Sequence, residues 1–279
     1  MPSAPICITI AGSDSCAGAG IQADIKTFAQ LGCYGMSVIT ASTAQTHLGV
    51  NDMHVLPVKH VEKQLSSLLR NYRISAIKTG MLASAEHIAM ISDVLSHHPN
   101  IPLICDPVLG ASSGADWSCD SIKAAYIERL APISRLFTPN LDEATRLFTH
   151  YEPNELSEEM ASELRVSLAN FSQSTGSAIL LKGGHIDPQS NLVLDRLFIA
   201  NKDHKSYQHE RVRTANNHGT GCTLASAVAS FTALGHDLED SVSLAIQYLQ
   251  KVIKQSQTFL HDQAGEPAHN LPMNHFYTQ

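Results

Sequence analysis

Residues 6–32 of the chain read ICITIAGSDSCAGAGIQADIKTFAQLG and contain, in order, a β-rich run, a glycine-containing loop and a segment of helical period. The β-rich run is Ile6–Ile10, and Gly32 stands where the left-handed residue after a helix is expected. A strand followed by an amphipathic helix predicts the first half of a βαβ unit. The residues that define the apolar face of this helix are Ile21, Ile25, Phe28 and Leu31.

Short β-rich runs alternate with longer segments of helical period along the rest of the chain. This alternation predicts an α/β fold with a mostly parallel central sheet and helices on both faces. No repeat, low-complexity segment or linker interrupts the pattern, so residues 1–279 are expected to form a single domain. The remaining predicted strands are Met36–Thr40, Ala76–Lys78, Leu103–Cys105, Leu136–Thr138 and Ala178–Leu181.

The second half of the chain carries several element boundaries. Ser157 is a predicted N-cap, and the helix that it opens is expected to run to Ala169. The run Val193–Ile199 and the polar residues after it predict a hairpin at the sheet edge. A further amphipathic helix closes at Gly235, and Asp237 is expected to cap the last helix.

Composition excludes several classes of protein. Hydrophobic residues make up 43% and charged residues 16% of the chain, and no apolar run reaches the roughly 18 residues that a membrane span needs. The N-terminus lacks a basic and apolar signal segment, so a cytoplasmic location is expected. The formal charge of −7 comes without a Lys/Arg cluster, which argues against a nucleic-acid surface. The six cysteines include no Cys-x-x-Cys pair, so neither a zinc knuckle nor a redox dithiol is indicated.

Polar and glycine-rich residues follow each predicted strand. In an open parallel sheet, ligands bind at the edge where the carboxyl ends of the strands meet. The sequence therefore predicts one site at this edge. The segments that would meet there are Gly12–Ser15, Thr43–Gln45, Thr79–Met81, Asp106–Val108, Pro139–Asn140 and Gly183–His185.

The segment Gly18–Ala23 matches the dinucleotide-binding pattern Gly-x-Gly-x-x-Gly/Ala, although the match is weak. No acidic residue ends the second predicted strand, where a dinucleotide site would hold the ribose. A close-packed loop over a small ligand is the better interpretation. Asp24, in the first turn of the following helix, is then either a ligand contact, which we favour, or a complement to the helix dipole.

The segment His218–Thr223 is a glycine-containing loop before a helix that is expected to begin near Thr223. The chain has no Walker-type phosphate loop, so phosphate would have to bind elsewhere. Backbone N–H groups of this loop and the positive end of the helix would hold an anion such as a transferring phosphoryl group. The alternative is an ordinary turn that caps the helix.

Cys222 lies where a helix N-terminus lowers the pKa of a thiol. Three roles stay open from the residues alone. The thiol could act as a general base for a substrate hydroxyl, as a covalent nucleophile, or as a small packed group beneath the helix.

Three further side chains suit phosphate chemistry. Asp106 follows a strand and suits Mg²⁺, which prefers one or two carboxylates plus phosphate oxygens. Glu143 lies three residues after Asn140 and would either hold a metal-bound water or form a capping box. Lys182 ends a strand and would either face phosphate or lie in water.

Together these segments resemble the hydroxymethylpyrimidine/phosphomethylpyrimidine kinase family, thiamine-pathway enzymes of the ribokinase-like superfamily. The likeness runs in order through nearly the whole chain. The segments that carry it are Ala11–Ser15, Gly18–Asp24, Thr43–Gln45, Lys78–Leu82, Asp106–Val108, Pro139–Ala144, Leu181–His185 and His218–Thr223. The resemblance implies a three-layer ribokinase-like fold, a homodimer and the use of ATP and Mg²⁺. It also implies phosphorylation of 4-amino-5-hydroxymethyl-2-methylpyrimidine, and then of the monophosphate to the diphosphate.

The resemblance further implies a role for individual residues, with Cys222 as a general base rather than a covalent nucleophile. The implied catalytic group is Gly219, Thr220, Gly221 and Cys222. The implied substrate contacts are Gly12, Asp24, Gln45, Met81 and Val108. The implied nucleotide contacts are Asn140, Glu143, Lys182, Thr214 and His218, and the implied Mg²⁺ ligands are Asp106 and Glu143.

Other interpretations remain open at this stage. The same fold serves pyridoxal kinases, and some relatives act on both alcohols; Met81 and the segment at Gln45 favour the pyrimidine. A thiol hydrolase that pairs Cys222 with His218, or a non-catalytic vitamin-binding regulator, would be a different class of protein. The chain departs from the family pattern at Thr46-His47 and Ser112-Ser113, which bears on substrate selection more than on the reaction.

Overall fold

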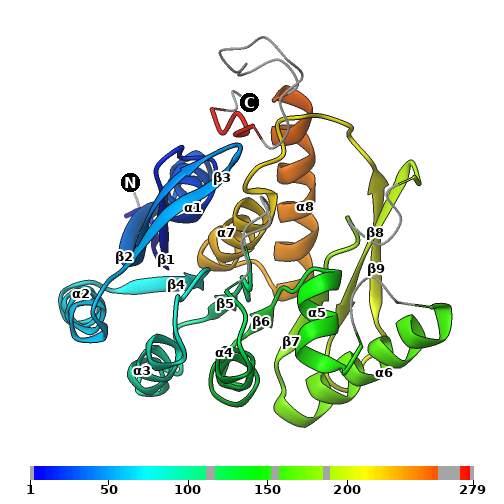
Figure 1. Cartoon of the computed structure of the whole chain (residues 1–279), viewed down its shortest axis with the longest axis horizontal. Helices are drawn as coiled ribbons and strands as arrows, with labels where there is room; N and C mark the ends of the chain where they lie inside the picture. Colours follow the sequence, from blue (N-terminus) through cyan, green and yellow to red (C-terminus); the bar gives the residue numbers. More distant parts are fainter. Residues whose placement is uncertain (1–2, 111–116, 152–156, 185–188, 257–270, 277–279) are drawn as a thin grey trace.

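The computed structural model describes residues 3–110, 117–151, 157–184, 189–256 and 271–276. Within these residues, one nine-stranded sheet forms the centre of the molecule, in the order β3-β2-β1-β4-β5-β6-β7-β8-β9 (Figure 1). The strands are β1 Ile6–Asp14, β2 Tyr34–Thr46, β3 Gly49–Val55, β4 Ile74–Thr79, β5 Leu103–Cys105, β6 Leu136–Phe137, β7 Ala178–Leu181, β8 Leu192–Phe198 and β9 Lys205–Glu210.

The six central strands, from β2 through β1, β4, β5 and β6 to β7, pair in parallel. Both margins are antiparallel: β3 folds back on β2, and β8 and β9 extend the sheet beyond β7. Because the central strands share one direction, their carboxyl ends open at one edge, where a doubly wound sheet places its ligands.

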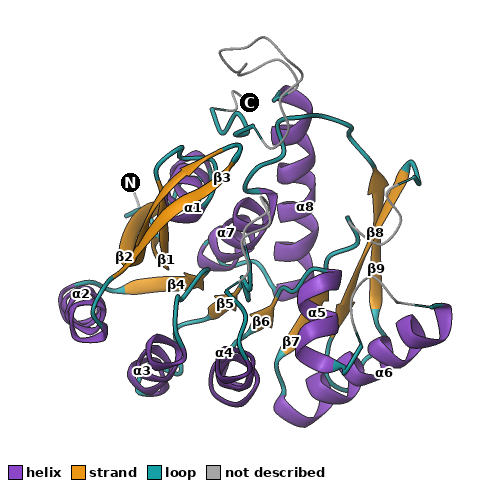
Figure 2. Cartoon of the chain, viewed as in Figure 1, coloured by secondary structure: helices purple, strands orange, loops and turns teal. Residues whose placement is uncertain are grey.

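Helices cover both faces of the sheet, which gives three layers (Figure 2). Helices α1, α7 and α8 lie on one face, and α2 to α6 lie on the other (Figure 1). None of the described helices combines the length and the hydropathy that a membrane crossing requires. The helices are α1 Gly20–Gln30, α2 Val58–Asn71, α3 Ala85–Ser96, α4 Asp120–Ala125, α5 Leu141–Phe148, α6 Glu158–Thr175, α7 Thr220–Ala233 and α8 Leu238–Gln255; a π-helix (Tyr126–Leu130) and a 3-10 turn (Ala131–Ile133) follow α4.

Each face of the sheet has its own hydrophobic core. On the side of α2 to α6, the core includes Ile8, Ile77 and Phe137; on the side of α1, α7 and α8, it includes Phe28 and Val228. Side chains of a parallel strand alternate between the two cores, so the strands read as continuous apolar runs in the sequence.

The sequence predictions of the central strands, the edge hairpin and the caps at Ser157 and Asp237 are confirmed. Two helix boundaries were wrong. Helix α6 continues past Ala169 to Thr175 and ends there because Gly176 adopts a left-handed φ of 77°. Helix α7 begins at Thr220 rather than near Thr223. Strand β3 was not predicted. The sequence features at His185 and Ser112-Ser113 lie outside the described residues.

Candidate active site

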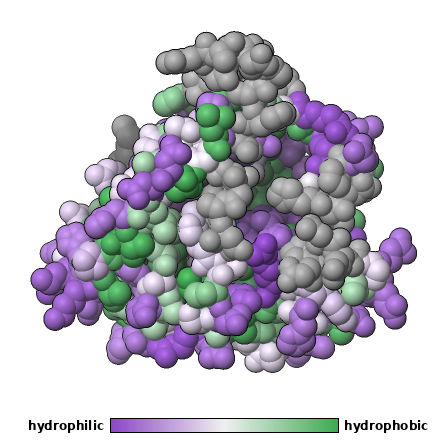
Figure 3. Space-filling view, in the orientation of Figure 1, coloured by the Kyte–Doolittle hydropathy of each residue, from purple (hydrophilic) through white to green (hydrophobic). Residues whose placement is uncertain are grey.

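A pocket of about 600 Å³ opens at the carboxyl ends of the parallel strands. On the face of the molecule seen in Figure 3, hydrophilic residues gather at the centre, near the upper end of α5 as placed in Figure 1. Residues far apart in the sequence meet in this pocket, as the topology predicted. Its walls contain every predicted site residue except Asp24: Gly12, Gln45, Met81, Asp106, Val108, Asn140, Glu143, Lys182, Thr214, His218, Gly219, Thr220, Gly221 and Cys222.

Asp24 does not line the pocket, which corrects the prediction that it contacts the substrate. Its side chain is fully buried and forms an ion pair with Lys78, at 2.8 Å from Nζ to Oδ2. The hydroxyl groups of Thr9 and Ser226 donate further hydrogen bonds to the carboxylate, at 2.6 and 2.7 Å. The carboxylate therefore joins β1, β4 and α7 beneath the site and has no free edge for a ligand.

The loop before α7 is held open by a close contact between two glycines. Gly219, the N-cap residue of α7, has φ 86° and offers no side-chain cap. A Cβ at this position would collide with the carbonyl oxygen of Gly18. The N–H of Thr220 donates to the carbonyl of Asn217 and that of Thr223 to the carbonyl of Gly219. Among the described residues this leaves the N–H groups of Gly221 and Cys222 for an anion at the pocket wall, together with the positive end of the helix dipole. This arrangement suits an anion.

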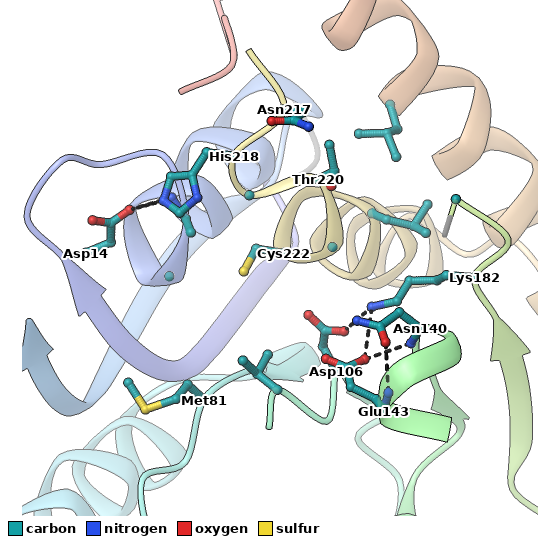
Figure 4. A pocket seen from close by; sticks show the side chains of 18 of the residues that line it. Asp14, Met81, Asp106, Asn140, Glu143, Lys182, Asn217, His218, Thr220 and Cys222 are labelled. Atoms are coloured by element: carbon teal, nitrogen blue, oxygen red, sulfur yellow. Dashed lines mark hydrogen bonds and ion pairs between the residues drawn. The ribbon is translucent and has the colours of Figure 1, made fainter. Parts of the chain in front are cut away.

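The thiol of Cys222 lies in this first turn, between the Met81 side of the pocket and the Lys182 side (Figure 4). Burial raises its pKa to about 11, although the Lys78 cation opposes this shift. The prediction of a lowered pKa was therefore wrong, because desolvation of the thiolate outweighs the helix end and the lysine. The thiol is neutral near pH 7.

A lysine and two carboxylates form the opposite wall. Nζ of Lys182 lies 2.8 Å from Oδ1 of Asp106 and 3.7 Å from Oε2 of Glu143 (Figure 4). Burial raises the pKa of Glu143 to about 7; the Lys182 charge lowers it and the Asp106 charge raises it further. Burial disfavours the Lys182 cation, but Asp106 and Glu143 more than compensate and raise its pKa. In this poorly solvated wall, the charge of each of the three groups therefore affects the pKa of its neighbours.

Asn140 and Glu143 also form the capping box of α5. The Asn140 side chain accepts from the N–H of Glu143 at 2.9 Å, and Glu143 Oε2 accepts from the N–H of Asn140 at 2.7 Å. The capping alternative is therefore confirmed, and it fixes one carboxylate oxygen. The carboxylates of Asp106 and Glu143 still fit Mg²⁺, which takes one or two carboxylates plus phosphate oxygens. The two buried carboxylates repel each other, and a bound cation would relieve this repulsion.

The other side of the pocket has the composition of a small-ring site. Met81 packs against Gly12, where a Cβ would collide with the methionine methyl group. Gln45 is almost fully buried, and its Nε2 lies 3.3 Å from Nε2 of His218. Val108 is a further apolar residue of the pocket lining. Apolar walls with a few fixed polar groups are typical of a pocket that orients a ring.

Asp14 had no predicted role of its own, but its carboxylate lies 2.9 Å from Nε2 of His218 (Figure 4). Burial opposes ionisation of Asp14, but hydrogen bonds from His218 and from the Ala19 N–H lower its pKa to about 2. Burial also opposes the His218 cation, yet Asp14 raises the pKa of the imidazole to about 9. The pair joins the loop after β1 to the loop before α7. In the sequence, only the aspartate within Gly12–Ser15 pointed to this pair. Its partner is 204 residues away, so the pair itself could not be predicted.

Comparison with known proteins identifies the family. A model of the phosphomethylpyrimidine kinase family matches residues 14–267. A hydroxymethylpyrimidine/phosphomethylpyrimidine kinase of Haemophilus influenzae is 36% identical over 247 residues, which are 88% of this chain and 90% of that protein. A thiamine biosynthetic bifunctional enzyme of Arabidopsis thaliana is 35% identical over 273 residues, 98% of this chain, but the chain spans only 50% of that relative's length.

Solved structures agree with this result. A phosphomethylpyrimidine kinase of Clostridium difficile superposes with a TM-score of 0.75 at 34% identity, covering 89% of this chain and 99% of that chain. A pyridoxal kinase of Staphylococcus aureus, solved with AMP-PCP and pyridoxal, superposes with a TM-score of 0.82 at 28% identity, covering 98% of this chain and 94% of that chain. The chain therefore belongs to the phosphomethylpyrimidine kinase family and has the ribokinase-like fold of these kinases.

Proposed function

We propose that this chain transfers the γ-phosphoryl group of ATP to the hydroxymethyl group of 4-amino-5-hydroxymethyl-2-methylpyrimidine, and then a second phosphoryl group to the monophosphate. The observation that carries the proposal is the arrangement of one pocket around the anion loop Gly219–Cys222. Met81 lies on one side of Cys222, and Lys182 and Asn140 lie on the other (Figure 4). An acceptor and a donor bound on the two sides would meet at the loop.

The nucleotide would occupy the Lys182 side. Asn140 and Lys182 are polar groups on this side (Figure 4). The pocket lining also contains Thr214 and four apolar side chains that suit a purine: Val212, Leu224, Leu249 and Ile253. Lys182 would neutralise charge on the transferred phosphoryl group, which is the main electrostatic demand of such a reaction. Asp106 and Glu143 would hold Mg²⁺, which supplies charge neutralisation to the phosphates when bound.

The ring alcohol would occupy the Met81 side. Gln45 offers both an amide donor and an amide acceptor to a ring rich in such groups, and a buried polar edge of a ligand must be paired. Met81 and Val108 would then hold the two faces of the ring. The hydroxymethyl oxygen would point toward Cys222 and the N–H groups of the loop.

Cys222 is our proposed acceptor of the hydroxyl proton. The thiol is neutral in the free site at pH 7. A neutral thiol does not accept the proton, so only the fraction of enzyme with a thiolate at Cys222 has an active base. In a loose phosphoryl-transfer transition state, positioning and charge neutralisation dominate the catalysis. Proton removal by the base therefore contributes little early in the reaction. A hydrolase mechanism with His218 as the base is disfavoured, because His218 is held as a cation by Asp14.

The second candidate is a pyridoxal kinase, favoured by the superposition on the Staphylococcus aureus enzyme with a TM-score of 0.82. An ADP-release assay with the pyrimidine alcohol, its monophosphate and pyridoxal tests both functions. We expect the pyrimidine alcohol to have the highest kcat/KM. A preference for pyridoxal above tenfold, about 1.4 kcal/mol in transition-state binding, would reverse the assignment. Ligand binding without ATP consumption would favour the regulator instead.

Homodimerisation and a cytoplasmic location stay predictions. Sedimentation equilibrium of the purified chain and fractionation of cells that express it are the measurements that check them.

A further inference from the structure

Asp14, Cys16 and His218 form a cluster of metal-ligating side chains beside the proposed transfer site. One ligand atom from each residue lies within 4.8 Å of the ligand atoms of the other two. Nε2 of His218 is 2.9 Å from Oδ2 of Asp14, and Sγ of Cys16 is 3.4 Å from the same oxygen. Zn²⁺ bonds of about 2.0–2.3 Å in a tetrahedron put ligand atoms roughly 3.3–3.6 Å apart. Side-chain adjustments of about 1 Å would therefore close this set around one ion.

The carboxylate of the cluster is already oriented. Oδ2 of Asp14 accepts hydrogen bonds from the N–H groups of Gly18 and Ala19 at 3.1 and 2.8 Å, and Oδ1 accepts from the N–H of Cys16 at 3.0 Å. Outer hydrogen bonds of this kind fix a ligating carboxylate and raise metal affinity. The ordering of Asp14 is thus achieved by folding rather than by the metal.

The ligands would supply the charge that a divalent ion needs in a buried place. Metal ligands must be deprotonated, so Zn²⁺ would form bonds to the Asp14 carboxylate, to the thiolate of Cys16 and to the neutral imidazole of His218, and the displaced protons would pass to the solvent. The carboxylate and the thiolate contribute two negative charges against the two positive charges of the ion, so no uncompensated charge is buried.

We propose that Asp14, Cys16 and His218 form a binding site for a thiophilic divalent cation, with Zn²⁺ as the first choice, and that occupancy of this site inhibits the kinase. Carboxylate, thiolate and imidazole together are the ligand set of zinc rather than of magnesium, which takes oxygen ligands. Asp14 and His218 line the pocket, so the fourth position of the tetrahedron would be open to water.

Inhibition follows from the position of His218, and this part rests on the proposed function. Nε2 of His218 would leave both Asp14 and Gln45 for the ion, so two contacts between the anion loop and the ring side of the pocket would be lost. The anion loop and the ring site would be disturbed together. Binding of the ion itself does not depend on whether the chain is a kinase.

The binding test uses the purified full chain and Zn²⁺ alone, in competition with a chromophoric chelator. We expect one equivalent to bind with release of protons to the buffer, and Cys16→Ser to weaken this binding at least 100-fold. Co²⁺ should give a thiolate charge-transfer band that Cys16→Ser abolishes. Cys119→Ser, which alters an exposed cysteine, and Cys222→Ser, which alters the other pocket thiol, should both bind as the parent chain does.

The activity test adds Zn²⁺ to the ADP-release assay under excess Mg²⁺. We expect at least a tenfold loss of turnover, reversed by a zinc-selective chelator, and no comparable loss in Cys16→Ser, which keeps basal activity. Equal zinc affinity in the parent chain and Cys16→Ser overturns the site. Zinc binding that depends on Cys16 but leaves turnover unchanged overturns the inhibitory role alone. A chain without any kinase activity would still show the Cys16-dependent binding, which separates the two proposals.

Discussion

Nζ of Lys78 lies 2.8 Å from Oδ2 of Asp24, and neither side chain is exposed to solvent. The Asp24 charge raises the pKa of Lys78 although burial opposes the cation, so the lysine stays charged in the core. Removal of one partner of such a pair leaves an uncompensated charge. We therefore expect Asp24→Ala to lower the free energy of unfolding by about 3–5 kcal/mol, measured by urea denaturation.

The matched control replaces both members of the pair. Asp24→Leu combined with Lys78→Met leaves no buried charge, and we expect it to recover most of the lost stability. A normal unfolding midpoint for Asp24→Ala, together with a raised KM for the pyrimidine, would restore the ligand-contact role that the sequence suggested for Asp24.

The case of Asp24 shows where prediction from the sequence stops. Hydrophobic periodicity and strand order fix which segments meet at the carboxyl edge, so the pocket walls were predicted well. Periodicity does not say whether a polar residue in a first helical turn faces the ligand or the sheet. The partner of Asp24 is 54 residues away inside an apolar strand, and that of Asp14 is 204 residues away.

Strand β3 was missed because its side chains are largely exposed. Asn51 and Asp52 lie in its middle, so it lacks the apolar and polar alternation of a half-buried strand.

The raised pKa of Cys222 gives a pH dependence for the proposed base. With a pKa of about 11, the thiolate fraction rises about tenfold per pH unit between pH 7 and 9. We expect kcat/KM to rise with it, and Cys222→Ala to lose most turnover while it still binds ligand. Alkylation of Cys222 by iodoacetamide in the free enzyme should follow the same slope. A kcat/KM that is flat with pH would contradict the base role.

Cys119 provides the control for the alkylation measurement. Its thiol is exposed, and hydrogen bonds to Ser121 and to the N–H of Ile122 lower its pKa. At pH 7 this cysteine should react before Cys222, and peptide mapping of the labelled chain separates the two sites.

Lys182 should be essential for turnover. Lys182→Met removes the cation that lies 2.8 Å from Asp106 and leaves two carboxylates without a counter-charge on the nucleotide side. Loss of one preorganised charge at a transfer site lowers kcat by about 10²–10³-fold. Steady-state kinetics with ATP check this value, and Lys254→Met, an exposed lysine on α8, is the control. A change in KM for ATP with kcat intact would make Lys182 a binding group only.

The Asp14–His218 pair should make stability depend on pH. The pKa of His218 is raised from 6.5 to about 9 in the folded chain, so its stabilising effect is complete below about pH 6.5 and is lost as the pH rises through about 9. The loss amounts to about 3 kcal/mol. Urea denaturation of the parent chain and of His218→Gln, with a chelator present, isolates this contribution. Equal slopes of stability against pH in the two proteins would show that the pair is not formed.

Gly219, the N-cap residue of α7, offers a test of the anion loop against Gly235, a left-handed glycine beyond the other end of the same helix. Gly219 and Gly235 have φ angles of 86° and 96°, but only at Gly219 would a Cβ meet other atoms, those of Gly18 and Ala19. Gly235→Ala should therefore show only the cost of a left-handed alanine, about 1–2 kcal/mol, with unchanged turnover. Gly219→Ala carries the same conformational cost and must also separate the two loops, so we expect a larger loss of stability and a loss of turnover of at least tenfold. Equal effects on unfolding and on kcat in the two variants would mean that the contact between the loops does not position the phosphoryl site.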